Sequence, residues 1–264
     1  MPFSRPITAI MRKRYSCRNY LKKPMEASQL SALQQVMQSL PDGPFGSLER
    51  FELAASTDED RRVLENFGYR MELIVLHATD LELGTCWLGG TFSRSSFSHK
   101  IHAAKDEIIA AVCAVGQINN DPSAIDHAVR LGAGAQSRQA WESLFFDGKF
   151  GTALTSQAAG EYAEVLEMVR IGPSASNKQP WRIVKDGDRW HFFLQRTKGY
   201  REWWVMKLMG LADMQRIDMG IAMCHFAMAA GEAGLAGSWQ VNQPGNDPAA
   251  GVAEYVITWN PEAA

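Results

Sequence analysis

Two long apolar segments constrain the fold most. Residues 63–84, VLENFGYRMELIVLHATDLELG, and residues 212–237, ADMQRIDMGIAMCHFAMAAGEAGLAG, carry apolar side chains nearly all round a helix. Such a helix is stable mainly when its whole surface is packed, so we expect each to form the buried centre of its part of the chain. The chain has 264 residues, 46% of them hydrophobic, and can therefore bury a core of this size.

The two long segments are flanked by the same order of elements. A helix and strands are predicted around each, and residues 118–160, rich in small and polar residues, are predicted to connect the two sets. In chain order the sequence predicts a helix at 27–40, a possible strand at 51–56, the first long helix, a strand at 108–117, a helix at 161–171, strands at 181–185 and 190–195, the second long helix and a strand at 253–259.

A weak internal repeat supports this duplicated order. VMQSLPDGPFGS, residues 36–47, aligns with VLEMVRIGPSAS, residues 165–176, at a constant shift of 165 − 36 = 129. Val, Gly, Pro and Ser match in the alignment. We therefore predict an α+β protein of two tandem halves, 1–135 and 136–264, related as a dimer fused into one chain.

Composition excludes several classes of partner. There are 27 Lys and Arg against 29 Asp and Glu, and the net charge of −2 provides no field that would attract nucleic acid or an anionic membrane. No apolar run is long enough for a signal peptide or a membrane span, so a cytoplasmic protein is expected. The cysteines are too far apart for a zinc site or a disulfide framework and are expected to be reduced thiols; they are Cys17, Cys86, Cys113 and Cys224.

Three segments differ from ordinary core sequence. In RYSCRNY, residues 14–20, Arg14, Ser16 and Arg18 alternate, and their guanidinium and hydroxyl groups suit a phosphate or another anion. A solvated basic face is the alternative. In LGTCWLGG, residues 83–90, consecutive glycines would let backbone N–H groups approach a ligand. A helix end followed by a loose turn is the alternative.

The third segment is GPSASNKQPW, residues 172–181, between a predicted helix and a predicted strand. Gly172 can end the helix, while Asn177 and Gln179 can both donate and accept hydrogen bonds. The segment is interpreted as a backbone-lined loop for a flat polar ligand, with a helix stop and N-cap as the alternative.

Together the three segments resemble the motifs of nitroreductase-like flavoproteins: Arg-x-Ser-x-Arg-x-aromatic, Gly-x-x-Trp-x-Gly-Gly and Pro-Ser-x-x-Asn-x-Gln-Pro-Trp. The resemblance implies a nitroreductase-like fold with antiparallel sheets. It also implies FMN sites at a dimer interface, with the phosphate and Gly-Gly segments from one subunit and the Pro-Ser loop from the other. Here the first half has PDGPFGS and the second half has GSWQVN in place of these motifs. A fused pseudo-dimer would thus keep one FMN site, and a monomer is expected rather than a homodimer.

The resemblance assigns roles to individual residues. Arg14 and Ser16 would hold the FMN phosphate and ribityl chain, Arg18 would lie near the pyrimidine edge of the ring, and Arg138, or else Arg130, would complete the phosphate site. No catalytic acid or base and no metal ligand is assigned, because the flavin itself would carry the hydride. The full set assigned to FMN is Arg14, Tyr15, Ser16, Arg18, Leu88, Gly89, Gly90, Arg138, Pro173, Ser174, Ala175 and Asn177.

The function implied is FMN-dependent reduction of a nitroaromatic, quinone or similar flat electron-poor small molecule by NADH or NADPH in a ping-pong cycle. Alternatives are a reductive dehalogenase or ene-reductase on the same fold, a flavin-binding sensor or store without turnover, and a module without cofactor. His225 is expected to be a core histidine, with a role where the halves meet as the alternative. The WWVMKLMG run, 203–210, is interpreted as core or as a lid over the substrate face.

Overall fold

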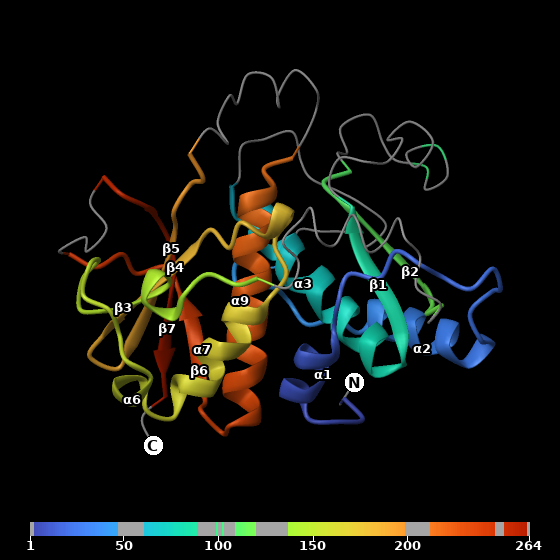
Figure 1. The fold of residues 1–264 in the computed structure, drawn as a ribbon, viewed down its shortest axis with the longest axis horizontal. Helices are drawn as coiled ribbons and strands as arrows, with labels where there is room; N and C mark the ends of the chain where they lie inside the picture. The colour runs from blue at the N-terminus through green and yellow to red at the C-terminus, as the bar shows by residue number, and fades with distance from the viewer. Residues whose placement is uncertain are drawn as a thin grey trace.

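The computed structural model describes residues 3–46, 61–88, 99, 102, 109–119, 137–198, 212–245 and 251–262. Figure 1 shows a larger sheet and a smaller one on opposite sides of a central group of helices. The helices are α1 Ile7–Lys13, α2 Ala27–Gln38, α3 Arg61–Asp80, α6 Ser156–Ala159, α7 Tyr162–Ile171 and α9 Met214–Glu232, with 3₁₀ turns η1 Trp141–Ser143 and η2 Ala175–Asn177. The strands are β1 Leu83–Leu88, β2 Val112–Gln117, β3 Phe145–Asp147, β4 Trp181–Asp186, β5 Arg189–Leu194, β6 Gly237–Gln240 and β7 Glu254–Pro261.

The two sheets differ in size and in one strand direction. Strands β1 and β2 form an antiparallel pair, and the other sheet has the order β3-β4-β5-β7-β6. Its pairs are antiparallel except β3 with β4, which is parallel. The prediction of antiparallel sheets is therefore wrong at this edge. The reason is that α6 and α7 lie between β3 and β4 in the chain, and a helical crossover returns the chain in the same direction.

Most of the predicted elements are confirmed. The helices at 27–40 and 161–171 and the strands at 108–117, 181–185, 190–195 and 253–259 appear as α2, α7, β2, β4, β5 and β7. Helix α3, predicted at 63–84, is found at Arg61–Asp80, and residues 83–88, for which no strand was predicted, form strand β1. The predicted connection contains β3 and α6, while residues 51–56 lie outside the described residues.

The second long helix is shorter than predicted. It ends at Glu232 rather than at 237, because the chain turns at Gly234, whose φ of 73° is in the left-handed region that favours glycine. The chain then enters β6, so the segment GSWQ is a strand in the second half, as β1 is in the first. In each half a long helix is followed by two strands that pair with each other in antiparallel fashion.

Helix α9 forms the centre of the main core. Its side chains are buried over nearly its whole length, including those of Arg216, Asp218 and His225. Its apolar residues pack between α3, α7 and the inner face of the larger sheet, where Phe226 contacts the rings of Trp190 and Trp259. The prediction of a buried central helix is therefore confirmed for α9.

The two central helices approach each other at a pair of glycines. A Cβ atom on Gly68 of α3 would lie 2.2 Å from the backbone oxygen of Ile217, and one on Gly220 of α9 would lie 1.9 Å from the backbone oxygen of Glu65. Each glycine thus meets the residue three positions before the other glycine. The contact is reciprocal, as a two-fold relation between α3 and α9 requires.

This geometry predicts opposite effects for two substitutions on the same helix. Gly220→Ala would place a methyl group against the backbone of α3 and should lower the free energy of unfolding by at least about 2 kcal/mol. Gly231→Ala is the matched control, because, apart from its own helix backbone and chain neighbours, no atom of the described residues lies within 4 Å of its Cβ position. It should be neutral or stabilising by up to about 1 kcal/mol through helix propensity. Urea unfolding measures both, and equal effects would contradict the close helix contact.

Candidate functional site

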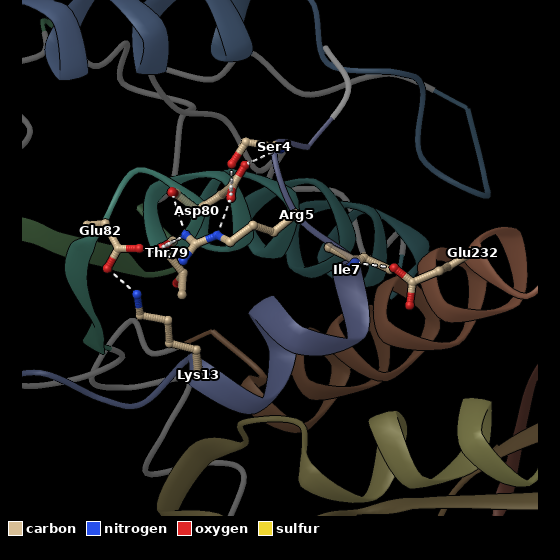
Figure 2. Close-up of polar contacts among 8 residues, drawn as sticks. All are labelled: Ser4, Arg5, Ile7, Lys13, Thr79, Asp80, Glu82 and Glu232. Atoms are coloured by element: carbon tan, nitrogen blue, oxygen red, sulfur yellow. Dashed lines mark hydrogen bonds and ion pairs between the residues drawn. The ribbon is translucent and has the colours of Figure 1, made fainter.

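Helix α1 is held between the ends of the two central helices (Figure 2). The backbone N–H of Ile7 donates to the carboxylate of Glu232 at the end of α9. Just before α1, Arg5 donates to the carboxylate of Asp80 and to the backbone oxygens of Thr79 and Asp80 at the end of α3. These contacts pair backbone groups that helix ends leave unsatisfied. The residue that follows α1 is therefore fixed relative to both halves.

That residue is Arg14, the C-cap of α1, whose side chain is only 9% exposed. Its Nε has no hydrogen-bond partner among the residues that the structure describes. Burial lowers the pKa of Arg14, and the charge of Glu72 on α3 opposes that shift. A buried guanidinium is costly unless an anion accompanies it, so this position is suited to bind one.

The residues after Arg14 run beside β1. Ser16 forms a parallel bridge with Thr85. Exposure changes along the segment: Arg14 is buried, Tyr15 and Ser16 are half-buried, and Arg18 is exposed. The alternation seen in the sequence therefore does not put the two arginines in one environment, and Arg14 is the one enclosed by protein.

The loop after α7 has an unusual backbone conformation. Ser176, Asn177 and Gln179 have φ values of 49°, 55° and 48°. Residues other than glycine uncommonly adopt this left-handed backbone conformation. The hydroxyl of Ser174 accepts from the backbone N–H of Gln179 at 2.9 Å, and the amide of Asn177 donates to the backbone oxygen of Ser137 at 2.9 Å. Such conformations cost about 1 to 3 kcal/mol each and often occur at ligand sites.

Arg138 links this loop to Arg14. Its guanidinium donates to the side-chain oxygen of Asn177 at 3.3 Å. Burial lowers the pKa of Arg138, and the positive charges of Arg14 and Arg170 lower it further. Arg170 is balanced by a two-pronged contact with Glu167, with distances of 2.7 and 2.8 Å. The buried Arg14 and the half-buried Arg138, one from each half, thus repel each other, and an anion bound by both would offset that repulsion.

A buried polar cluster lies behind Arg14. The carboxylate of Glu72, fully buried on α3, accepts from the indole N–H of Trp87 at 3.0 Å and contacts His225 Nε2 of α9 at 3.0 Å. His225 Nδ1 faces the backbone oxygen of Met168 at 2.9 Å, so Nδ1 carries a hydrogen and donates it. The contact between Nε2 and Glu72 Oε1 then needs one hydrogen, carried by either of these two atoms. The cluster joins α3, α7, α9 and β1.

The structure brings several of the residues predicted from sequence to one place. Arg138 donates to Asn177, and Arg14 is near enough for its charge to lower the pKa of Arg138. The loop that carries Asn177 also carries Pro173, Ser174 and Ala175. Leu88 is half-buried at the end of β1. Gly89, Gly90, Arg130 and the 203–210 run lie outside the described residues.

Sequence reasoning missed the buried acids of the long helices, among them Glu72 and Asp218. Each of these two is a single carboxyl within an otherwise apolar stretch of a long helix, MELIVL and IDMGIAM. Since a buried carboxyl needs a partner, an isolated acid in such a stretch was the available signal. His225 is a core histidine as predicted, and its contact with Glu72 also lies between the halves.

Comparisons with known proteins agree with this architecture. The chain resembles the crystal structure of a "putative nitroreductase" from Thermotoga maritima, with a TM-score of 0.62 and 17% identity over 98% of this chain and 95% of that one. A "nitroreductase family protein" from Clostridium difficile matches 50% of this chain and 92% of its own at 17% identity, with a TM-score of 0.33. No curated protein matches the sequence.

The larger of these similarities shows the nitroreductase fold. A family model described as "Putative TM nitroreductase" matches residues 42–230, which include α3, the loop after α7 and all but the last two residues of α9. The chain belongs to this nitroreductase family. Arg14 and its neighbours lie before the matched residues.

Within the described residues, no helix has the length and apolar character needed to cross a membrane.

The buried cluster yields a prediction about Glu72. Glu72→Leu would leave the indole N–H of Trp87 and Nε2 of His225 without their partner and should cost about 3 to 5 kcal/mol of unfolding free energy. Glu72→Gln should cost no more than about 1.5 kcal/mol, because an amide can accept from Trp87 and donate to a neutral His225. Urea unfolding followed by tryptophan fluorescence compares them, and equal losses would show that the cluster requires a carboxylate charge.

Proposed function

We propose that the chain is an FMN-dependent oxidoreductase that takes hydride from NADH or NADPH and reduces a flat electron-poor acceptor such as a nitroaromatic or a quinone. The observation that carries this proposal is the buried guanidinium of Arg14, whose Nε has no partner among the described residues and whose charge acts on Arg138. Membership of the nitroreductase family supports the reaction class.

The residues present fit the FMN phosphate. A phosphate supplies several acceptor oxygens and a double negative charge, which matches the planar donors of the buried Arg14 and the half-buried Arg138 better than a neutral ligand would. Ser16, half-buried beside β1, is close in sequence to Arg14 and could add a hydroxyl donor. Arg14, Arg138 and Ser16 would therefore hold the phosphate end of the cofactor.

The ring end is assigned to the loop and to the end of β1. Pro173, Ser174, Ala175 and Asn177 would lie against the ring, and the backbone after Leu88 would complete its edge. Asn177 of this loop donates to the backbone oxygen of Ser137 and accepts from Arg138. Because these hydrogen bonds hold the loop in place before a ligand binds, it can present a preformed surface. Arg18, four residues after Arg14 in the sequence, is exposed and would lie near the pyrimidine edge of the flavin ring.

When bound, FMN supplies the group that accepts and donates hydride, so no nucleophile or acid–base residue of the chain is required. The task of the protein is to hold the ring rigidly, balance the phosphate charge and limit access of water. The reciprocal contact of Gly68 and Gly220 supports the further proposal that the chain is an internally duplicated pseudo-dimer with a single flavin site, and that it acts as a monomer.

The proposed function predicts the cofactor content of the chain and its reaction with a nicotinamide. The purified chain should contain one FMN per chain, and anaerobic addition of NADH or NADPH should bleach its visible absorption. Released flavin is identified by chromatography and counted against protein. Two flavins per chain at saturation would contradict the single-site proposal, while bound flavin that no nicotinamide bleaches would favour a sensor or store.

The proposed function also predicts how a substitution of Arg14 changes flavin binding. Arg14→Ala removes a charge-assisted contact and should weaken FMN binding by about 1.5 to 3 kcal/mol, roughly ten- to a hundredfold, with little effect on riboflavin, which has no phosphate. Arg12→Ala is the control, since Arg12 is on the same helix but is exposed and pairs with Glu164. It should change neither affinity. Equal losses for FMN and riboflavin in the Arg14 variant would rule out a phosphate contact.

A further inference from the structure

Asp218 is a buried acid that the proposed function does not use. It lies on α9 with 1% of its surface exposed, and its Oδ1 accepts from the backbone N–H of Ala175 at 2.9 Å. Its Oδ2 is also buried and has no hydrogen-bond partner among the described residues. Asp218 therefore supports the loop after α7 with one oxygen, while the other has no assigned contact.

The same helix position in the first half gives a direct comparison. Asn66 precedes Gly68 by two residues, as Asp218 precedes Gly220. Asn66 Oδ1 accepts from the backbone N–H of Phe45 at 3.0 Å, and its Nδ2 donates to the backbone oxygen of Gly46. Both halves thus use this position to fix the loop before it. Only in the first half does the loop also occupy the second polar atom.

The surroundings of Asp218 favour its neutral form. On its own helix, Arg216 is engaged with Glu65 of α3 and Glu254 of β7, and Asp213 adds a second negative charge. From the loop, only the neutral N–H of Ala175 faces the carboxyl. Burial raises the pKa of Asp218 well above its usual range, the Ala175 N–H opposes this, and Asp213 adds to it.

The position of the proton follows from the hydrogen bond. A neutral carboxyl has one oxygen that accepts and one that donates. Because Oδ1 accepts from Ala175, the hydrogen is on Oδ2. The donor equivalent to the Asn66 amide is thus present in the second half, but no loop oxygen takes it up. A buried donor without an acceptor costs about 1 to 3 kcal/mol, which a ligand acceptor would recover.

We propose that Asp218 is a ligand-binding residue that stays neutral and donates its Oδ2–H to a carbonyl oxygen or ring nitrogen of the flat heterocycle held against the loop at 173–177. This rests on the proposed function, since the heterocycle is the ring of the bound flavin. Asp218 also positions the loop through Ala175. Neither role is a transfer of its proton.

The charge state is tested on the chain without flavin. A carboxyl whose folded pKa lies above its unfolded value stabilises the fold at low pH, and this contribution is lost as pH rises toward the folded pKa. Above the ordinary Asp value of 3.8, the folding constant of the parent should therefore fall relative to that of Asp218→Asn, by up to about tenfold per pH unit. Parallel pH profiles for the two proteins would overturn the neutral assignment.

The donor role is tested by binding of FMN and riboflavin. Asp218→Leu should weaken both flavins by about five- to tenfold, because the contact is to the ring and not the phosphate, while Asp218→Asn keeps a donor and should stay within about twofold of the parent. Asn66→Leu is the matched control at the equivalent position and should change neither affinity. Equal effects of the two Leu variants would overturn the donor role.

A second measurement does not depend on the Leu variant folding. Riboflavin affinity of the parent should fall as pH rises and Asp218 ionises, and the affinity of Asp218→Asn should fall less over the same range. Equal pH dependence would overturn the donor role. If the parent binds neither flavin at any pH, the proposed function fails and the ligand contact fails with it, whereas the unfolding experiment still decides whether Asp218 is neutral.

Discussion

The backbone contact between α3 and α9 is the constraint on which the rest of the structure depends. Because Gly68 and Gly220 have no side chain, the backbones of α3 and α9 can contact each other directly at these two positions. Two buried polar pairs lie on either side of that contact: the ion pair of Glu65 with Arg216, and the hydrogen bond between Glu72 and His225. Such pairs are costly to bury and are satisfied in only one alignment of the helices, so we infer that they fix the helix register.

The proposed anion site follows from that alignment. Helix α1 is capped by Glu232 at the end of α9, and the residues before it are bound to Asp80 at the end of α3, so α1 can be placed only once α3 and α9 are paired. Its last turn then sets Arg14 beside Glu72 and near Arg138. The guanidinium is positioned by contacts at the opposite end of its helix, which explains how a helix of seven residues can hold a buried side chain in a defined place.

Elements with strong local patterns could be predicted from the sequence, and elements set by distant contacts could not. Strand β5 is short and rich in aromatic residues, a turn precedes it, and the sequence predicts it within one residue of its bounds. Helix α1 has seven residues, too few to be stable alone, and depends on partners 75 and 225 positions away. The motifs predicted the loop and Arg14 as site residues, but the pairing of Glu72 with His225, 153 positions apart, has no local signature.

The two halves hold their equivalent loops in different ways, and the difference supports the proposal that the loop of the second half binds the ligand. In the first half the positive φ of the loop, 88°, falls on Gly46, where it costs little, and Asn66 pairs with backbone groups on both its polar atoms. In the second half Ser176 and Asn177 hold positive φ with side chains, and Asp218 pairs through one oxygen. Strain and an unused donor both lower stability. They occur together in the half whose loop accepts a hydrogen bond from Arg138, and a ligand bound there, as proposed, would recover the loss.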